Sequence, residues 1–389
     1  MNSTFHKLEK QVADVLDAAV NYRRQLHAVP ELAHVEEKSS AIVAEALREL
    51  DLNVRTNVGT TGIIANLETG RPGPLVVLRA DMDALPVDES TDVPYRSQHP
   101  GHSHACGHDG HMAALIGAAR VLHAMRDDLS GTVRFLFQPA EESASGAREL
   151  IEEGAFTDRA PDAIIGLHAW PGLPTNVVAC RPGIMMASTD AFLLEIRGKG
   201  GHSSKPANAL NPLNVMAELI QELPKLSHDD RIITVCMARA GRAHNVIPEL
   251  GMLSGTCRAL SDALREQTRR DLEMRVHAIC AKLGYGVKII FQEGCPPLTV
   301  DERLYDLFLK TGKALGIETR LLKQPSMGAE DFAFYLEHGP GLMFRIGVGE
   351  ESPYLHAPQF NFNDDALATG ITMLAAMVIM IGETFEAGP

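Results

Sequence analysis

The feature that most constrains this fold is an alternation of β-rich runs with helical stretches in the first half of the chain. After an early β-rich run, "TGIIANL" (61–67), comes a second, "PLVVLRADMDALPV" (74–87), and then "MAALIGAARVLHAM" (112–125), which is apolar enough for a largely buried helix. Two further β-rich runs follow, "GTVRFLFQPAEE" (131–142) and "DAIIGLHAW" (162–170), with the helical stretch "ARELIEEG" between them. This order predicts an α/β fold with a mostly parallel sheet covered on both faces.

The pattern changes near residue 185. The runs "TDAFLLEIRGKG" (189–200) and "GMLSGTCRAL" (251–260) alternate apolar and polar positions, as half-buried strands do, and helical stretches occupy 211–223 and 261–283. The α/β pattern returns after about residue 298, so a compact α+β domain is expected to be inserted into the larger domain. The predicted limits are 1–185 and 298–389 for the larger domain and 186–297 for the inserted domain.

The charge of the chain argues against two classes of partner. Fifty acidic residues against thirty-six basic ones give a formal net charge of −14 at pH 7. A surface of that sign repels phosphate backbones and anionic lipids, so neither a nucleic acid nor a membrane is expected as a partner. A single local basic group can still hold a small anion, and the charge therefore leaves the substrate open.

Cysteine usage and the N-terminus both favour a cytoplasmic protein. The six cysteines are scattered without a C-x-x-C pair, and the N-terminal stretch has no basic-then-apolar export signal. The only long apolar run, Ala366–Gly382, is slightly shorter than the ~20 residues of a spanning helix and contains two threonines and two glycines. We expect it to form a buried core helix.

Potential metal ligands follow one predicted strand after another. Taken singly, such a carboxylate is more often a helix cap or a solvated charge, and such a histidine more often a packed core residue. In open α/β sheets, however, ligands bind at the carboxyl ends of the strands, so the recurrence indicates one common site. The residues placed in this way are Asp81, Asp83, Glu141, Glu142, His168 and His356.

The stretch "HACGHDGH" (104–111) is compatible with a structural zinc knuckle, a catalytic metal centre or a polar loop. A structural zinc site needs further cysteines or a compact histidine pair to complete it, and neither a C-x-x-C pair nor a clean H-x₃₋₅-H partner for this stretch is present. Cys106 and His108, two residues apart, suit Zn²⁺, Co²⁺, Ni²⁺ or Mn²⁺ better than Mg²⁺ or Ca²⁺. Ligands drawn from separate strand ends favour an open catalytic site, which can hold two ions.

The neighbouring glutamates suggest a division of labour. One of the two can bind metal while the other stays free to take a proton from a water molecule. A solvated charge pair is the alternative, and the position of Glu141 and Glu142 directly after Gln138-Pro139 at the end of an apolar strand weakens it.

A series of motifs between residues 22 and 365 resembles one known group of enzymes. In order, they are "RRQLHAVPEL", "LRADMDALPV", "HACGHDGHMA", "FQPAEES", "GLHAWPGLP", "GKGGHSSKP", "HNVIPE", "MGAEDF" and "LHAPQFNFND". Together they resemble the aminoacylase/carboxypeptidase-type metallo-amidohydrolases, in the branch that contains hippurate hydrolases and auxin–amino-acid conjugate hydrolases. The Cys-Gly-His turn combined with the paired glutamates is highly specific to that branch.

The resemblance implies a dinuclear metal site, with two divalent ions (Mn, Zn, Co or Ni) in each subunit. It makes Glu141 the general base, places Asp83 behind the site as the residue that orients a ligand histidine, and makes Cys106 the bridging ligand. Related peptidases carry a histidine where this chain has Asp81, so Asp81 is not counted as a ligand. The implied ligands are Cys106, His108, Glu142, His168 and His356.

The resemblance also gives the inserted domain a role as lid and dimerisation domain, and hence implies a homodimer or higher homo-oligomer. His202 of "GKGGHSS" would reach the partner subunit's site and stabilise a tetrahedral oxyanion. Asn245 and Arg258 would help to hold the carboxylate of the substrate. His104, Asp109 and His111 are left without a role, as residues that could lie behind the site or cap the helix.

The implied reaction is hydrolysis of the amide bond of an N-acyl amino acid, of N-acetyl or N-benzoyl (hippurate-like) type. The products are a carboxylic acid and a free amino acid. Three alternatives remain at this point: a dipeptidase or an N-acetyl-diaminopimelate-type deacetylase of the same superfamily, a non-catalytic metal-binding protein, and a fold that zinc merely holds together. The acyl group, the preferred amino acid and the metal are not readable from the sequence.

Overall fold

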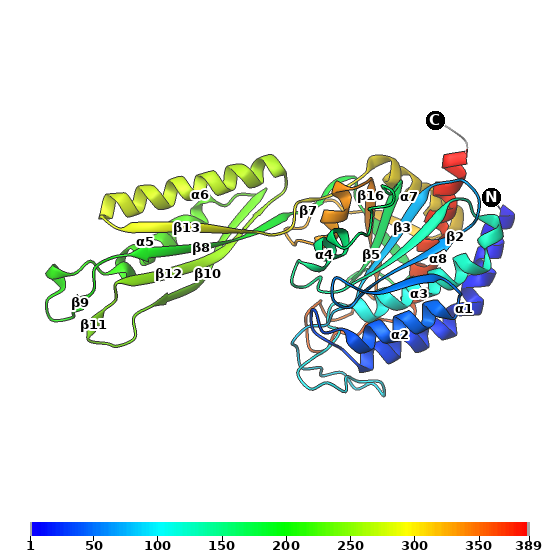
Figure 1. The fold of residues 1–389 in the computed structure, drawn as a ribbon, viewed down its shortest axis with the longest axis horizontal. Helices are drawn as coiled ribbons and strands as arrows, with labels where there is room; N and C mark the ends of the chain where they lie inside the picture. Colours follow the sequence, from blue (N-terminus) through cyan, green and yellow to red (C-terminus); the bar gives the residue numbers. More distant parts are fainter. Residues whose placement is uncertain (1, 387–389) are drawn as a thin grey trace. The chain divides into compact units, whose positions relative to one another are not determined.

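A computed structural model describes residues 2–386 of the chain, which form two compact units (Figure 1). The larger unit contains the chain up to Gly183, Thr299–Lys323 and the chain from Asp331 onward. The smaller unit contains Ile184–Leu298 and Gln324–Glu330. Gln324–Glu330, which the sequence analysis counted with the larger domain, is tied to the smaller unit because Ala187 N–H donates to the Ser326 carbonyl at 2.9 Å.

The larger unit is built on an eight-stranded sheet in the order β1-β2-β4-β3-β5-β16-β6-β15. The four central strands, β4, β3, β5 and β16, run parallel to one another. Every residue of β3 is buried, as expected for a strand covered on both faces. The α/β class with a mostly parallel sheet is thus confirmed. The strands are β1 (Asn53–Val58), β2 (Gly62–Glu68), β3 (Leu75–Asp81), β4 (Thr132–Gln138), β5 (Ala163–Trp170), β6 (Val177–Cys180), β15 (Glu318–Leu321) and β16 (Gly341–Gly347).

Helices α1, α3 and α8 pack against one another, and α3 and α8 also pack on the central strands. The helix α3 is almost wholly buried, since its early turns are rich in alanine and glycine and its neighbours approach closely. The helices of this unit are α1 (Asn2–Ala28), α2 (Glu37–Arg48), α3 (His108–Ala124), α4 (Gly146–Glu152), α7 (Glu302–Leu315) and α8 (Ala366–Glu386), with short 3₁₀ turns η1 (Arg126–Asp128) and η4 (Asp331–Glu337).

Within residues 2–386, α8 is the one helix that is long and apolar enough to cross a membrane by length and composition. Most of that stretch is buried inside the protein, against α1, α3 and α7. The expectation of a buried core helix is therefore confirmed.

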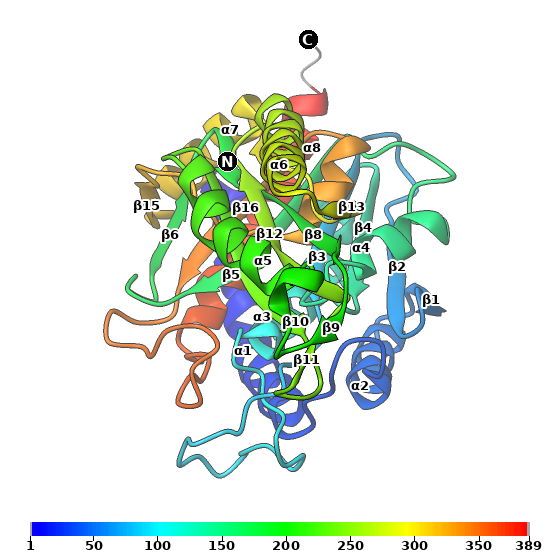
Figure 2. The same ribbon diagram turned by 90° about the vertical axis from the view of Figure 1, so that its left-hand side faces the viewer.

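The smaller unit is an antiparallel sheet in the order β10-β12-β8-β13, with α5 and α6 packed on it (Figures 1 and 2). Burial alternates strictly along β8, and the buried side faces a core that includes Phe192, Leu253 and Val276. Its main elements are β8 (Ser188–Arg197), α5 (Pro212–Glu222), β10 (Arg231–Ala240), β12 (Leu250–Ala259), α6 (Asp262–Leu283) and β13 (Gly286–Glu293), with η2 (Pro206–Asn208) and η3 (Leu223–Leu226).

Two small ribbons complete the fold. A two-residue strand, β9 (Gly201–His202), pairs with β11 (Val246–Ile247), which sets His202 opposite Val246. A second ribbon, β7 (Gly183–Met186) with β14 (Leu298–Val300), forms where the chain leaves and re-enters the larger unit.

Candidate metal centre

The strand ends of the larger unit bring the predicted ligands together. Because β4, β3 and β5 are parallel neighbours, the residues at their carboxyl ends meet at one edge of the sheet. Asp81 ends β3, the paired glutamates follow β4, and His168 lies near the end of β5. The helix α3 starts at His108, two residues after Cys106.

The turn from Cys106 to His108 depends on the glycine between them. Gly107 has φ +88°, a left-handed conformation that other residues adopt only with strain. A Cβ at this position would also lie 3.0 Å from the Cβ of Ala169 and 3.4 Å from the ring of Phe360. The turn is therefore closely packed against β5, and this packing places Cys106 beside His168.

One group of donor atoms comes from Cys106, His108 and His168, whose ligand atoms lie within 4.8 Å of one another. The Cys106 Sγ lies 3.5 Å from the Nε2 of His168. His168 donates from Nδ1 to the Ala169 carbonyl, and His108 donates from Nδ1 to the Asp83 carbonyl, both at 2.8 Å. These bonds leave the Nε2 atom of each ring available as a ligand, in the arrangement typical of metal-binding histidines.

A second group consists of Cys106, Glu142 and His356, so Cys106 belongs to both. The Glu142 Oε1 lies 3.4 Å from the His356 Nε2 and 3.9 Å from the His108 Nε2. The loop of His356 is held in place by its own backbone N–H, which donates to the Ala105 carbonyl at 2.8 Å. The structure thus brings all five predicted ligands together around Cys106.

Asp83 lies behind both groups. Its carboxylate oxygens accept hydrogen bonds from the backbone N–H groups of Glu141 (3.1 Å) and Glu142 (3.0 Å). Since its backbone carbonyl also accepts from His108, a single residue orients one histidine and fixes both glutamates. The contact of Asp83 with a histidine was expected from the sequence, whereas its contact with the glutamates was not.

The charge states of the side chains around the centre, which are neutral or negative, favour the binding of a cation. Burial and the neighbouring His111 lower the pKa of His168 to about 3, so its imidazole is neutral. Burial raises the pKa of the Cys106 thiol, which therefore needs a positive charge beside it to ionise. Burial opposes ionisation of Glu142, but His356 and His108 outweigh it and lower the pKa of its carboxyl group.

The residues present fit a pair of transition-metal ions. Two buried atoms at the centre, the His108 Nε2 and the Glu142 Oε1, have no hydrogen-bond partner in the described structure, which is unusual for buried polar atoms. Sulfur, imidazole and carboxylate donors together suit zinc, cobalt, nickel or manganese. Two donor groups that share Cys106 support two such ions.

His111, left without a role above, lies close to Asp81 and His108 but has both ring nitrogens engaged. Its Nδ1 donates to Asp81 at 2.6 Å, and its Nε2 accepts from the backbone N–H of Ala169 at 2.8 Å. Asp81 in turn forms an ion pair with Arg79 at 2.7 Å. Because these contacts occupy both side chains, neither His111 nor Asp81 is free to bind a metal ion. The contacts also anchor β5 next to His168.

Asp109 belongs to none of the donor groups and ties α3 to α1. It accepts from the His27 Nδ1 at 2.7 Å and forms an ion pair with Arg23. Glu89 contacts the other ring nitrogen of His27 at 3.1 Å. Burial opposes protonation of His27, but these two carboxylates outweigh it and raise its pKa to about 9. His104 is also fully buried, and that burial lowers its pKa to about 3.

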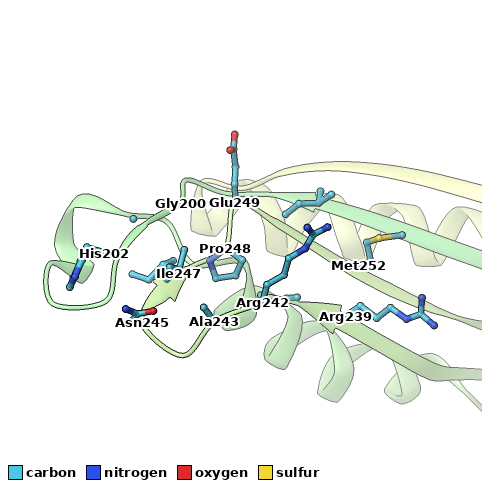
Figure 3. A pocket seen from close by; sticks show the side chains of 15 residues that line it. Gly200, His202, Arg239, Arg242, Ala243, Asn245, Ile247, Pro248, Glu249 and Met252 are labelled. Carbon is cyan, nitrogen blue, oxygen red and sulfur yellow. The ribbon is translucent and has the colours of Figure 1, made fainter.

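The remaining predicted site residues belong to the smaller unit, and two of them line one pocket of about 890 Å³ (Figure 3). His202 and Asn245 lie at the same end of it. The Nδ1 of His202 accepts from the backbone N–H of Ser204 at 3.1 Å, so the neutral ring carries its proton on Nε2. Arg258 does not line this pocket, and its guanidinium donates to the Met327 carbonyl at 2.8 Å.

Cysteine, histidine and carboxylate donors meet at the strand ends of this α/β sheet, and a further glutamate lies beside them. This arrangement defines a metal-binding hydrolase. More specifically, the chain belongs to the peptidase family M20/M25/M40, whose model matches residues 77–380. The resemblance drawn from the motifs is thereby confirmed.

Relatives of known name support the same class. The chain is 36% identical to an N-acetyl-L-cysteine deacetylase of Bacillus subtilis (strain 168) over 366 residues, covering 92% of this chain and 85% of the relative. It is 35% identical to IAA-amino acid hydrolase ILR1-like 2 of Arabidopsis thaliana over 378 residues, covering 94% and 85%. It is an enzyme that hydrolyses amide bonds.

A solved relative supports the number of metal ions. The structure of the Bacillus subtilis YXEP protein, described as a dinuclear metal binding peptidase of the M20 family, matches with a TM-score of 0.86 and 31% identity. The match covers 96% of this chain and 99% of that one. Together with the two donor groups around Cys106, it supports two divalent metal ions in this enzyme.

Proposed function

We propose that this enzyme hydrolyses N-acyl amino acids of N-acetyl or N-benzoyl type, including hippurate-like substrates. The observation that carries the proposal is the pair Glu141–Glu142, held side by side by Asp83 next to the metal donors. A storage or transport site has no need of a second glutamate at that position. Two relatives whose names give N-acetyl-cysteine and IAA-amino acids as substrates support the N-acyl amino acid class.

In this proposal five residues would hold the two ions, and Cys106, which belongs to both donor groups, would be the ligand they share. Manganese, zinc, cobalt and nickel are the candidate metals. When bound, such ions lower the pKa of a water molecule and polarise the amide carbonyl. The ligands are Cys106, His108, Glu142, His168 and His356.

Glu141 moves the protons. It accepts one from the attacking water as the new C–O bond forms at the amide carbonyl, and it returns that proton to the leaving nitrogen as the C–N bond breaks. His202 donates its Nε2 proton as a hydrogen bond to the developing oxyanion, consistent with the tautomer that Ser204 imposes. Asn245 and Arg258 hold the substrate carboxylate.

The assembly and location belong to the same proposal. We infer a cytoplasmic homodimer in which His202 of one subunit serves the site of the other. The six free cysteines, with no disulfide among them, support a reducing compartment.

The first test is a Glu141→Gln variant, which keeps the size of the side chain and removes the base. We expect full metal content and a loss of at least ~10² in kcat, as is typical when a general base is removed. Glu152→Gln, on the exposed end of α4, serves as the matched control. An unchanged kcat in Glu141→Gln contradicts the assigned role.

The second test is a substrate panel of N-acetyl and N-benzoyl amino acids and dipeptides. It uses enzyme reconstituted in turn with Mn²⁺, Co²⁺, Ni²⁺ and Zn²⁺. We expect N-acyl amino acids to exceed dipeptides in kcat/KM. The reverse ranking makes the enzyme a dipeptidase, selective turnover of N-acetyl-diaminopimelate makes it a biosynthetic deacetylase, and metal binding without turnover makes it a binding protein.

A further inference from the structure

Arg345 is a buried cation for which the described residues supply no counter-charge. Six arginines are buried in the described structure, and five of them form ion pairs with aspartates. For Arg345, 7% exposed, no ion pair or hydrogen bond of its guanidinium is found within residues 2–386. The five pairs are Arg23 with Asp109 and Asp364, Arg79 with Asp81 and Asp331, Arg134 with Asp158, Arg231 with Asp271, and Arg265 with Asp190.

Arg345 lies beside the metal centre in the same unit. It is on β16, in parallel register with His168 on β5, so the two side chains project from the same face of the sheet. Trp170, two residues after His168, shares that face as well. The guanidinium carbon of Arg345 lies 3.4 Å from the centre of the Trp170 ring, and this ring contacts His168 with centroids 6.3 Å apart.

No carboxylate is among the ionisable groups that influence Arg345 within residues 2–386. These groups are the Tyr354 hydroxyl and the Cys180 thiol, and burial raises the pKa of that thiol to about 12. Burial therefore lowers the pKa of Arg345 to about 10, whereas the carboxylates around Arg23 and Arg265 overcome burial and raise theirs. Stacking on Trp170 offsets only part of the cost of burying this charge.

We propose that Arg345 is a specificity-determining residue, which binds a carboxylate of the substrate next to the metal centre. A guanidinium matches a carboxylate with two parallel hydrogen bonds, and stacking on Trp170 holds its plane in a fixed orientation. That the ligand is a substrate rests on the proposed function. The carboxylate has two possible sources. It is either the α-carboxylate of the amino acid, which Arg345 would then bind in place of Asn245 and Arg258, or a carboxylate on the acyl group.

The chain carries its own reporter for this site, because Trp170 is its single tryptophan. A carboxylate that binds Arg345 changes the charge directly above the indole ring, and hence its fluorescence. Titrating metal-free enzyme measures binding without turnover. The ligands are N-acetyl-L-methionine, N-acetyl-L-methioninamide, which lacks a carboxylate, and N-succinyl-L-methioninamide, which carries one on the acyl side.

We expect a saturable fluorescence change with one or both acids and a markedly weaker one with N-acetyl-L-methioninamide. Arg345→Met, which keeps an unbranched chain in place of the aliphatic part of arginine and removes the guanidinium, should weaken binding of the acid by about 10- to 100-fold, the value of a charge-assisted hydrogen bond. Arg345→Lys should retain part of the affinity. Arg120→Met is the matched control, since it removes a guanidinium that stacks on Tyr22. Which acid loses affinity in Arg345→Met identifies the source of the carboxylate.

Three results overturn the proposal: no fluorescence response of the wild type, equal binding of the amide and the acids, or equal affinity of Arg345→Met and wild type for the acids. The metal-loaded enzyme adds a kinetic criterion, because loss of substrate binding raises KM with kcat little changed, whereas a purely structural role lowers thermal stability and leaves KM unchanged. If no N-acyl amino acid is hydrolysed while the fluorescence titration succeeds, the proposed function fails and the carboxylate site stands.

Discussion

At the scale of single residues, hydrogen bonds decide which of several similar side chains can bind metal. His108 and His111 are three residues apart at the start of α3, and both lie near Asp81. The first has a free Nε2, whereas the second uses both nitrogens, one of them on the backbone N–H of Ala169. Both residues are histidines in the same turn of the helix, so the physical reason why one can bind metal and the other supports the site lies in these contacts.

Asp83 gives a prediction at this scale. Asp83→Ala removes the acceptors of two partly buried backbone N–H groups and frees the loop of Glu141 and Glu142. Loss of a residue that orients metal ligands typically costs 10- to 100-fold in metal affinity or activity. We expect a loss of that order in both, measured by metal content after dialysis against limiting metal and by kcat. The control is Asp88→Ala, an exposed residue in the same segment. Wild-type metal content and kcat in Asp83→Ala would contradict this account.

At the scale of elements, much of the fold was predictable because its periodicities are strong. The buried strands of the large sheet, the buried helix α3 and the helices α5 and α6 all follow from apolar runs or from their spacing. Strand β10 was not predicted. Its burial pattern loses alternation after Ile233, and its pairing with β12 shifts register between Val235 and Met237, as at a β-bulge.

Contacts between distant elements could not be predicted from the sequence, for a different reason. The network that joins α1 to α3 pairs His27 with Asp109, 82 positions away, and with Glu89 in the loop after β3. Nothing local in the sequence marks these residues as partners. The sequence likewise could not show that Arg345 has no ion-pair partner among the described residues, because this is known only after every neighbouring side chain has been placed.

This network predicts how stability depends on pH. The pKa of His27 is raised from 6.5 to about 9 in the folded protein, so its contribution is fully present below pH 6.5 and is lost as the pH rises through 9. The loss is on the order of 3 kcal/mol. We expect the urea midpoint of the larger unit, followed by Trp170 fluorescence, to fall over this range in the wild type and to fall much less in His27→Gln. His6→Gln, at an exposed position, should behave as the wild type. Parallel pH profiles for wild type and His27→Gln would rule out this role.

At the scale of the whole molecule, the candidate metal site and the pocket that contains His202 belong to different units. The proposed metal ligands lie in the larger unit, and His202 and Asn245 lie in the smaller one. Each unit has its own buried core. Metal should therefore contribute to the stability of one unit and leave the other unchanged.

Removal of metal tests this separation. After chelation we expect activity to disappear while far-ultraviolet circular dichroism stays near its original value, because the apolar core of the larger unit does not depend on the ions. Hydrogen exchange should increase around Cys106 and Glu142 and remain unchanged in β8 and β12. Restored activity on adding Mn²⁺ or Zn²⁺ completes the experiment. Global unfolding on chelation would instead indicate a fold that metal holds together.

The place of β16 in the large sheet has a consequence for the order of synthesis. This strand lies between β5 and β6, and β6 joins the rest of the sheet only through it. A nascent chain that has completed the smaller unit therefore still presents the open, apolar edge of β5, and this edge can pair with another chain. The ribosome must add the residues up to Gly347 before that edge closes, and must go further, to His356, before the last of the proposed metal ligands exists.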